Sequence, residues 1–177
     1  IGRVFPPRDD ENDPISGNWI TPLAISSEGE VYAGFDGVYQ LQGNSWVKIS
    51  TSNFGGVQNG DVIEDLLVDP TNPDVIYAAE GASVYRSGDR GVTFQAFFNG
   101  DNPIADIAID TDDGSAIYVV TSLRVGIDQE RQLRDVGERK VWRIPVNANG
   151  DPGLEQDLSF ELPKDEAIFA IAHQGRH

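Results

Sequence analysis

The stretch from Asp69 to Phe98, DPTNPDVIYAAEGASVYRSGDRGVTFQAFF, reads as one self-contained structural unit. It begins with a turn rich in Pro, Asn and Asp, which are residues typical of turns. Apolar and β-branched residues then predict one strand over 75–79, a second over 84–86 and a third over 92–97. A tight turn separates the last two strands. The unit therefore predicts three consecutive antiparallel strands.

The tight turn, SGDRGVTF, fits the pattern S-x-D-x-G-x-T-aromatic. The side chains of Ser87 and Asp89 can hydrogen-bond the backbone amides of the turn, and Gly91 can take the positive φ that closing a hairpin requires. Thr93 and Phe94 then suit the start of a strand, because β-branched and aromatic residues favour strands. Each residue of the pattern thus has a structural role in the hairpin.

This octet, with DPTNPDVIYAA and SVYRS before it, resembles the Asp-box of bacterial-neuraminidase-type repeats. Such repeats occur in sialidases, sortilin-type receptors, xyloglucan-cleaving hydrolases and a photosystem assembly factor, which are all β-propellers. The resemblance implies that the octet lies in a hairpin at the outer rim of a propeller, where Asp89 is structural.

The strand that precedes this unit recurs along the chain, as a propeller requires. Four short segments align, and their third positions lie 43, 41 and 64 residues apart: Leu23, Leu66, Ile107 and Ile171. Second strands with a central tyrosine follow over 31–33, 75–79 and 116–120, and third strands over 38–40, 84–86 and 141–143. A period near 42 residues with four short strands is typical of a propeller blade. We expect the four third positions to be equivalent and buried between adjacent blades.

The repeats predict an all-β chain, an arc of four-stranded antiparallel blades. The predicted divisions are an entry segment over 1–18, blades over 19–50, 62–98 and 103–160, and the inner strand of a fourth blade over 167–177. The entry segment is either a loose lead-in or, in part, the outer strand of a preceding blade. Propellers close with about four to eight blades, and an open arc exposes sheet faces and edges. The chain is therefore expected to be part of a larger propeller, completed by the same longer chain or by another segment.

Composition excludes some partners. The formal charge is −16, which disfavours nucleic acids and anionic membranes because like charges repel. No apolar run is long enough to span a membrane, so membrane insertion is not expected. Cysteine is absent, so disulfides do not support the fold. Such acidity is common in secreted and in marine or salt-tolerant proteins and is compatible with binding divalent cations, so it does not select among these classes.

Two carboxylates recur at one position of the repeat. Asp65 and Asp106 occupy the same register on successive inner strands, where the other copies have Pro22 and Ala170. Inner strands line the central channel of a propeller, so these carboxylates could bind a cation or serve acid–base chemistry at its mouth. The simpler interpretation is that they cap solvated strand starts.

Two further patterns suggest chemistry but lack a complete set of residues. The segment 110–115 begins like a calcium loop, with Asp110 and Asp112 as ligands, yet it lacks the distal bidentate Glu and also fits a β-turn. Arg86 and Arg143 follow the aromatic residue of two third strands, whereas sialidase-like catalysis needs three convergent arginines. We expect no cofactor, with calcium as the alternative.

The 64-residue interval marks a blade with an insertion over 124–139, RVGIDQERQLRDVGER. Closing a blade requires only a short connection here. The insertion carries four arginines, Arg124, Arg131, Arg134 and Arg139, and as many acidic residues. It is either a solvated excursion held by ion pairs, which stabilise little, or a docking loop on one face of the propeller.

Three classes of function fit these observations. The first is a non-enzymatic interaction or scaffold segment of a larger exported or cell-surface protein, bacterial in origin, with a protein or glycan partner. The second is a carbohydrate-active hydrolase like the xyloglucan-cleaving propellers, with Asp65 and Asp106 as its carboxylates. The third is an assembly factor that binds a protein. An incomplete catalytic set favours the first class.

Overall fold

The computed structural model describes residues 22–51, 62–110, 112–121 and 140–159, together with the backbone of 124–127 and 133–136. The predicted entry segment over 1–18 and the predicted strand over 167–177 lie outside these described residues, and so does Ile171. Among the described residues no helix is long and apolar enough to cross a membrane.

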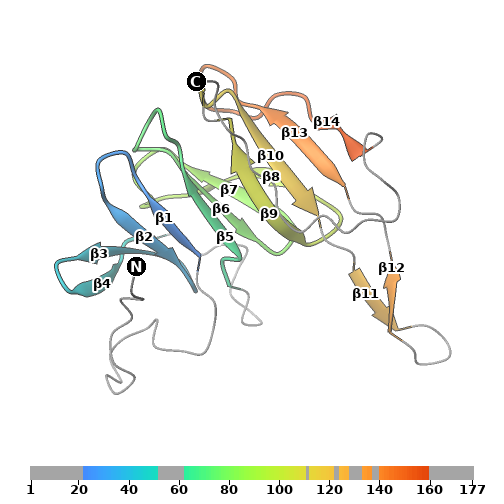
Figure 1. The fold of residues 1–177 in the computed structure, drawn as a ribbon, viewed down its shortest axis with the longest axis horizontal. Coiled ribbons are helices and arrows are strands. Elements are labelled where there is room, and N and C mark those ends of the chain that lie inside the picture. The colour runs from blue at the N-terminus through green and yellow to red at the C-terminus, as the bar shows by residue number, and fades with distance from the viewer. Residues whose placement is uncertain are drawn as a thin grey trace.

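The described chain forms three four-stranded antiparallel sheets and one separate hairpin (Figure 1). The first sheet contains β1 (Leu23–Ile25), β2 (Val31–Gly34), β3 (Val38–Gln42) and β4 (Ser45–Lys48). The second contains β5 (Asp65–Val68), β6 (Ile76–Glu80), β7 (Ser83–Ser87) and β8 (Gln95–Asn99). The third contains β9 (Ile104–Ile109), β10 (Ala116–Thr121), β13 (Val141–Pro145) and β14 (Gln156–Asp157). The hairpin joins β11 (Arg124–Ile127) to β12 (Leu133–Val136).

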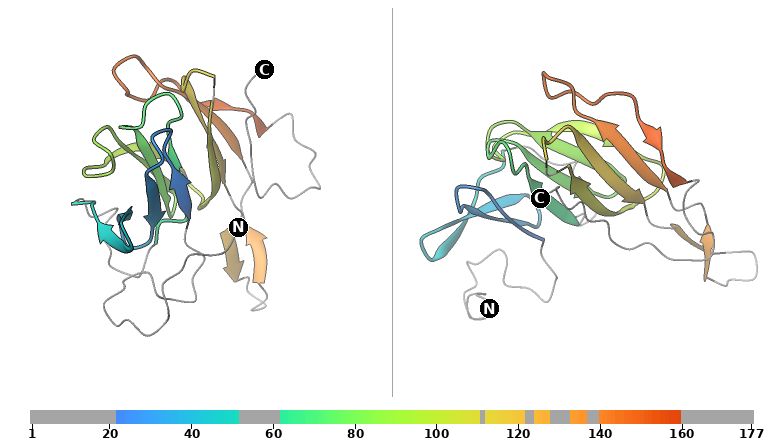
Figure 2. Two further views of the ribbon diagram at one scale, coloured as in Figure 1. Left: turned by 60° about the vertical axis from the view of Figure 1, so that its left-hand side comes forward. Right: turned by 45° about the horizontal axis from the view of Figure 1, so that its top comes forward.

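The order of strands in each sheet follows the order of the sequence apart from the hairpin, which lies between β10 and β13 in the chain. The first strands of the three sheets, β1, β5 and β9, are neighbours, and the sheets fan outward from them (Figures 1 and 2). Short turns suffice for this path because each strand pairs with the next one along the chain. The arrangement is that of successive blades around a common centre.

Register confirms the alignment of the repeats. Leu23 pairs with Ala33, Leu66 with Ala78 and Ile107 with Val119. The central tyrosine of each second strand pairs with the residue that follows each of these positions: Tyr32 with Ala24, Tyr77 with Leu67 and Tyr118 with Ala108. The three described copies therefore occupy equivalent places in their sheets.

Apolar side chains from facing sheets form two cores. The core between the first and second sheets includes Ala24, Tyr32, Val38, Ile63, Leu66, Ile76 and Ala78. The core between the second and third sheets includes Tyr77, Ala79, Val84, Phe98, Ile107, Ile117, Val119 and Ile144. Because successive strand residues point to opposite faces, the second sheet contributes one set of side chains to each core.

The burial expected at the repeat positions holds for two of the three described copies. Leu66 and Ile107 are each 2% exposed, whereas Leu23 is 53% exposed and Ile25, on the same face of β1, is 69% exposed. Leu66 faces the first sheet and Ile107 faces the second. Leu23 is exposed in this chain because its face of the first sheet points away from the second, and no described sheet covers it.

Glycine residues allow the first two sheets to lie close together. The backbone of Gly34 lies against Ile63, and a Cβ at Gly34 would come within 2.6 Å of Ile63 Cγ2. Gly91, with φ +85°, lies against Ile49, Ile76 and Val38, and its Cβ would lie 3.2 Å from Ile49 Cδ1. Glycine is thus used where one sheet must approach its neighbour closely.

Candidate functional site

Asp65 links two neighbouring inner strands. Its Oδ1 accepts a hydrogen bond from the backbone N–H of Leu66 at 2.8 Å, and its Oδ2 accepts one from the N–H of Ile107, on β9, at 2.9 Å. The side chain of Asp106 approaches closely enough to share a hydrogen bond with it. The fold thus brings Asp65 and Asp106 together, and it uses both oxygens of Asp65 to hold backbone amides.

Burial raises the pKa of the Asp65 carboxyl to about 6, since a charged group is disfavoured away from water. The nearby Asp106 carboxylate adds to this rise in pKa, while the N–H groups of Ile107 and Leu66 oppose it.

The turn over 87–94 has the hydrogen bonds that its sequence predicts. Ser87 Oγ accepts from the N–H groups of Asp89 and Gly91 at 3.2 and 2.9 Å, and donates to Asp89 Oδ1 at 2.7 Å. Asp89 in turn accepts from the N–H and the hydroxyl of Thr93 at 2.8 and 2.6 Å. Although burial acts in the opposite direction, these donors lower the pKa of Asp89. All the polar atoms in this set are used within the turn.

The expectation that Thr93 and Phe94 start a strand was wrong, because β8 begins at Gln95. Thr93 instead closes the turn through Asp89, and Phe94 packs into the core between the first and second sheets. The hydroxyl of Thr93 competes with extended pairing by binding locally, a common property of Thr in turns.

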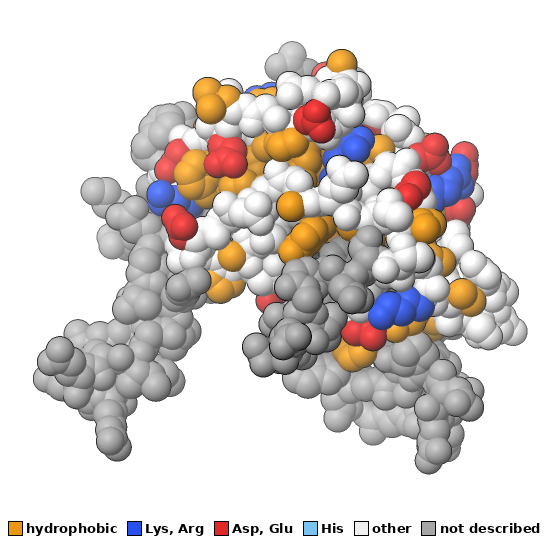
Figure 3. Space-filling model, turned by 180° about the vertical axis from the view of Figure 1, so that it is seen from behind, with side chains coloured by type: hydrophobic (Ala, Val, Ile, Leu, Met, Phe, Trp, Pro, Cys, Tyr) orange, Lys and Arg blue, Asp and Glu red, His pale blue; other side chains and the backbone are white. Residues whose placement is uncertain are grey.

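Arg90, in the same turn, connects the first and second sheets in a way the sequence did not reveal. Its guanidinium contacts Asp74 at 2.7 Å, Glu28 at 2.9 Å and Glu30 at 3.0 Å. The residue has a positive φ of 60°, which is uncommon outside glycine. Figure 3 likewise shows acidic and basic side chains next to one another on one face. No spacing rule links Arg90 to Glu28, so only the tertiary structure could show this network.

Asp110 and the described residues 112–115 lie between β9 and β10 and are joined by local hydrogen bonds. The N–H of Asp112 donates to Asp110 Oδ1 at 3.1 Å, and the N–H of Gly114 donates to the carbonyl of Asp110 at 2.9 Å. Gly114, with φ +65°, lies against the carboxylate of Asp69, the residue that follows β5. No cluster of three or more His, Cys, Asp or Glu suited to a metal ion occurs within the described part of the chain.

The insertion contains a two-stranded hairpin rather than only a loop. β11 and β12 pair in register from Arg124 opposite Val136 to Ile127 opposite Leu133. Figures 1 and 2 show the hairpin lying apart from the three sheets, beyond one end of the third. Arg124 and Arg134 lie on its strands, while Arg131 and Arg139 are outside the described residues.

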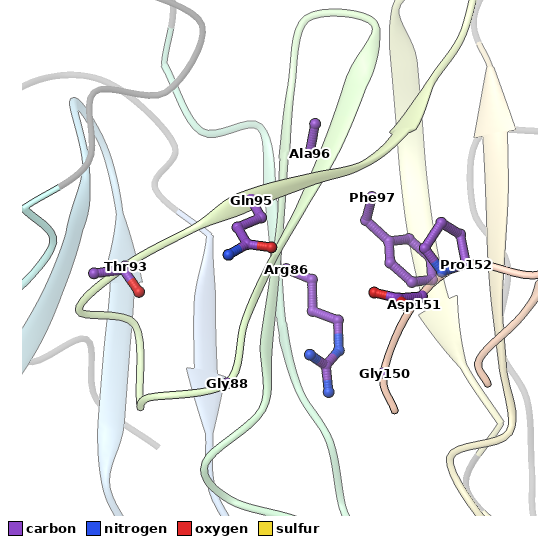
Figure 4. A pocket seen from close by; sticks show the side chains of 9 residues that line it. All are labelled: Arg86, Gly88, Thr93, Gln95, Ala96, Phe97, Gly150, Asp151 and Pro152. Carbon is purple, nitrogen blue, oxygen red and sulfur yellow. The ribbon is translucent and has the colours of Figure 1, made fainter. Parts of the chain in front are cut away.

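The two repeated arginines do not converge. Arg86 shares a face of the second sheet with Val84, which packs toward the third sheet. Arg143 lies between Trp142 and Ile144, which pack toward the second sheet, so it points to the opposite side of the third sheet. Arg86 lines a pocket with residues of the third sheet's outer loop (Figure 4). Arg86 was noted in the sequence as a repeated arginine, but no sequence pattern predicted this pocket.

Three four-stranded antiparallel sheets with adjacent first strands define an arc of a β-propeller. No protein-family model and no curated protein matches the chain. The crystal structure of a GH74 enzyme from Niastella koreensis is similar, with 20% identity and a TM-score of 0.55 over 76% of this chain. That of a GH74 xyloglucanase from Xanthomonas campestris has 17% identity and a TM-score of 0.43 over 70% of this chain. The aligned region spans only 20% and 26% of those two chains, and the likeness shows the fold alone.

Proposed function

We propose that this chain is a non-enzymatic binding segment of a larger β-propeller in an exported or cell-surface protein. The main support for this proposal is the exposed apolar face of β1. Leu23 has the register of Leu66 and Ile107, which are buried between sheets, yet it is exposed beside the exposed Ile25. An exposed apolar sheet face is an aggregation hazard, which a further blade would remove.

The state of the inner carboxylates supports a binding role over a hydrolytic one. Asp65 uses both oxygens to accept hydrogen bonds from backbone amides of β5 and β9. These contacts give Asp65 a role in joining sheets. Fold likeness to GH74 enzymes does not transfer their activity, because unrelated functions share the propeller fold.

We place the binding region on the side of the propeller where the β11–β12 hairpin lies. The hairpin exceeds what the connection from β10 to β13 requires, and insertions in repeat proteins gather on the binding face. Its partner is a protein or a glycan.

A matched pair of variants tests the larger propeller. In the 177-residue chain, Leu66→Ala should lower the free energy of unfolding by about 2–5 kcal/mol, and Leu23→Ala by under about 0.5 kcal/mol. In the full-length protein Leu23→Ala should cost as much as Leu66→Ala, because a further blade then covers it. An unchanged, small cost of Leu23→Ala in the full-length protein would refute the proposal.

Catalysis is tested separately in the full-length protein with soluble xyloglucan. We expect no release of reducing sugar above that of a heat-denatured sample. Turnover that disappears in both Asp65→Asn and Asp106→Asn, with both variants folded, would show that this pair is catalytic and that the binding-only proposal is wrong.

A further inference from the structure

A cavity of about 210 Å³ lies at the outer side of the second and third sheets. One wall comes from the β7–β8 hairpin, with Arg86, Thr93, Gln95 and Phe97, and the other from the loop after β13, with Asp151 and Pro152 (Figure 4). Phe97 is buried, whereas Thr93 and Gln95 are exposed. The lining therefore combines one buried aromatic side chain with polar side chains that solvent reaches.

A buried polar atom of a residue that lines this cavity is unsatisfied. Arg86 Nε has no hydrogen-bond partner among the described residues. The Arg86 guanidinium lies over the Tyr77 ring, 6.0 Å from its centroid, and Tyr77 packs edge-on against Phe97 at 5.3 Å. Folded proteins rarely leave such atoms unpaired, because each costs free energy comparable to a lost hydrogen bond. The unpaired N–H of Arg86 indicates a missing acceptor.

The guanidinium is held in place rather than free to search for a partner. It lies against the backbone of Gly150, where a Cβ would come within 2.6 Å of Arg86 Cζ, and Gly150 has φ +87°. The guanidinium also lies over the Tyr77 ring. An arginine that lies against both an aromatic ring and a glycine backbone presents its N–H groups in a restricted orientation, as recognition of a planar anion requires.

We propose that this pocket binds a carboxylate group, with Arg86 as its charged partner. The planar guanidinium matches a carboxylate, and the Gln95 amide on the same wall adds a neutral donor. Phe97 and Pro152 provide an apolar surface for the few carbons that carry the carboxylate. A cavity of this size holds a small organic acid or the end of an acidic side chain.

Charge favours a monoanion over a phosphate dianion. Asp151 also lines the pocket, where its carboxylate accepts a hydrogen bond from the Asn149 amide, and the chain carries a formal charge of −16. Each additional negative charge on the ligand increases its repulsion from Asp151 and from the protein as a whole. A single carboxylate gains the contact with Arg86 at the smallest cost.

The experiment is an NMR titration of the ¹⁵N-labelled chain with sodium propionate, matched in ionic strength by sodium chloride. We expect saturable shifts of the backbone amides of Gly88 and Gly150 and of the Gln95 side-chain amide. Arg86→Gln should weaken binding about tenfold or more, and Arg86→Lys less, because lysine keeps the charge but lacks the planar fork. Asp151→Asn should strengthen it about two- to fivefold by removing a repulsive charge.

The last variant separates binding from a structural role, since Arg86 acting only in packing would not make affinity depend on Asp151. The proposal would be overturned if the chemical-shift changes do not saturate or if sodium chloride alone reproduces them. It would also be overturned if Arg86→Gln and Asp151→Asn leave the changes unaltered. Tighter binding of phosphate than of propionate would overturn the carboxylate assignment. If Arg86→Gln fails to fold, Arg86→Lys and Asp151→Asn provide the same test.

A second arm identifies the source of the carboxylate. A blocked tripeptide Ala-Glu-Ala is compared with Ala-Gln-Ala and with propionate. If the Glu peptide binds about tenfold more tightly than propionate, the ligand is the acidic side chain of a protein segment. If the Glu peptide and propionate bind with equal affinity, the ligand is a free organic acid. Equal binding of the Glu and Gln peptides would refute recognition of the carboxylate.

Discussion

The buried Asp65 carboxyl makes stability depend on pH in a direction that can be calculated. Its pKa is raised from 3.8 to about 6, mainly by burial, so the folded protein binds a proton more tightly than the unfolded chain. The resulting stabilisation is fully present below pH 3.8 and is lost as pH rises through 6. The complete effect is up to about 3 kcal/mol, at about 1.4 kcal/mol for each pH unit.

The comparison of wild type with Asp65→Asn isolates this effect, because all other acidic groups are shared. Between pH 5 and 8, above the isoelectric point near 4.2, Asp65→Asn should gain about 1.4 kcal/mol in free energy of unfolding relative to wild type. The free energies come from urea unfolding followed by the fluorescence of the three tryptophans. Asn also loses one acceptor for the Leu66 or Ile107 N–H, which shifts the whole curve without changing its slope.

Asp106→Asn is the matched control. Because the Asp106 carboxylate contributes to the raised pKa of Asp65, this variant should move the transition in stability to lower pH. A difference between wild type and Asp65→Asn that stays within about 0.4 kcal/mol over this pH range would contradict the reasoning from burial. A difference of opposite sign would show that the two backbone N–H donors outweigh desolvation.

The remaining predictions concern the turn and the hairpin. Asp89→Ala should lower the free energy of unfolding by about 1–2 kcal/mol through the lost hydrogen bonds in its exposed turn, and a full-length variant that keeps its stability but loses partner binding would contradict this. Gly91→Ala should cost about 1–2 kcal/mol more than Gly43→Ala, measured by urea unfolding. Both glycines have positive φ, but only a Cβ at position 91 meets the neighbouring sheet, so equal costs would show that this contact is unimportant. Replacing 125–138 by a short Gly-containing turn should leave the melting temperature of the chain nearly unchanged and impair partner binding by the full-length protein; unfolding would show that the hairpin packs into the domain.

The sequence predicted the all-β class, the order of strands and the register of the repeats, because these depend on local patterns. Alternation of side chains along a strand and a period near 42 residues are visible in the sequence itself, and so are the hydrogen bonds of the 87–94 turn, whose partners lie within four residues of one another. Even the pairing of Asp65 with Asp106 followed from their equal register on adjacent inner strands.

Tertiary structure alone decided what each side chain meets across the gap between sheets. Leu23 and Leu66 share a register, yet one is exposed and the other buried, because burial depends on whether a neighbouring sheet exists. Arg90 reaches Glu28 across 62 positions of sequence, and Arg86 comes against Gly150 across the interface of two sheets. Such contacts carry no local pattern, since they arise from the packing of whole sheets rather than from the preferences of neighbouring residues.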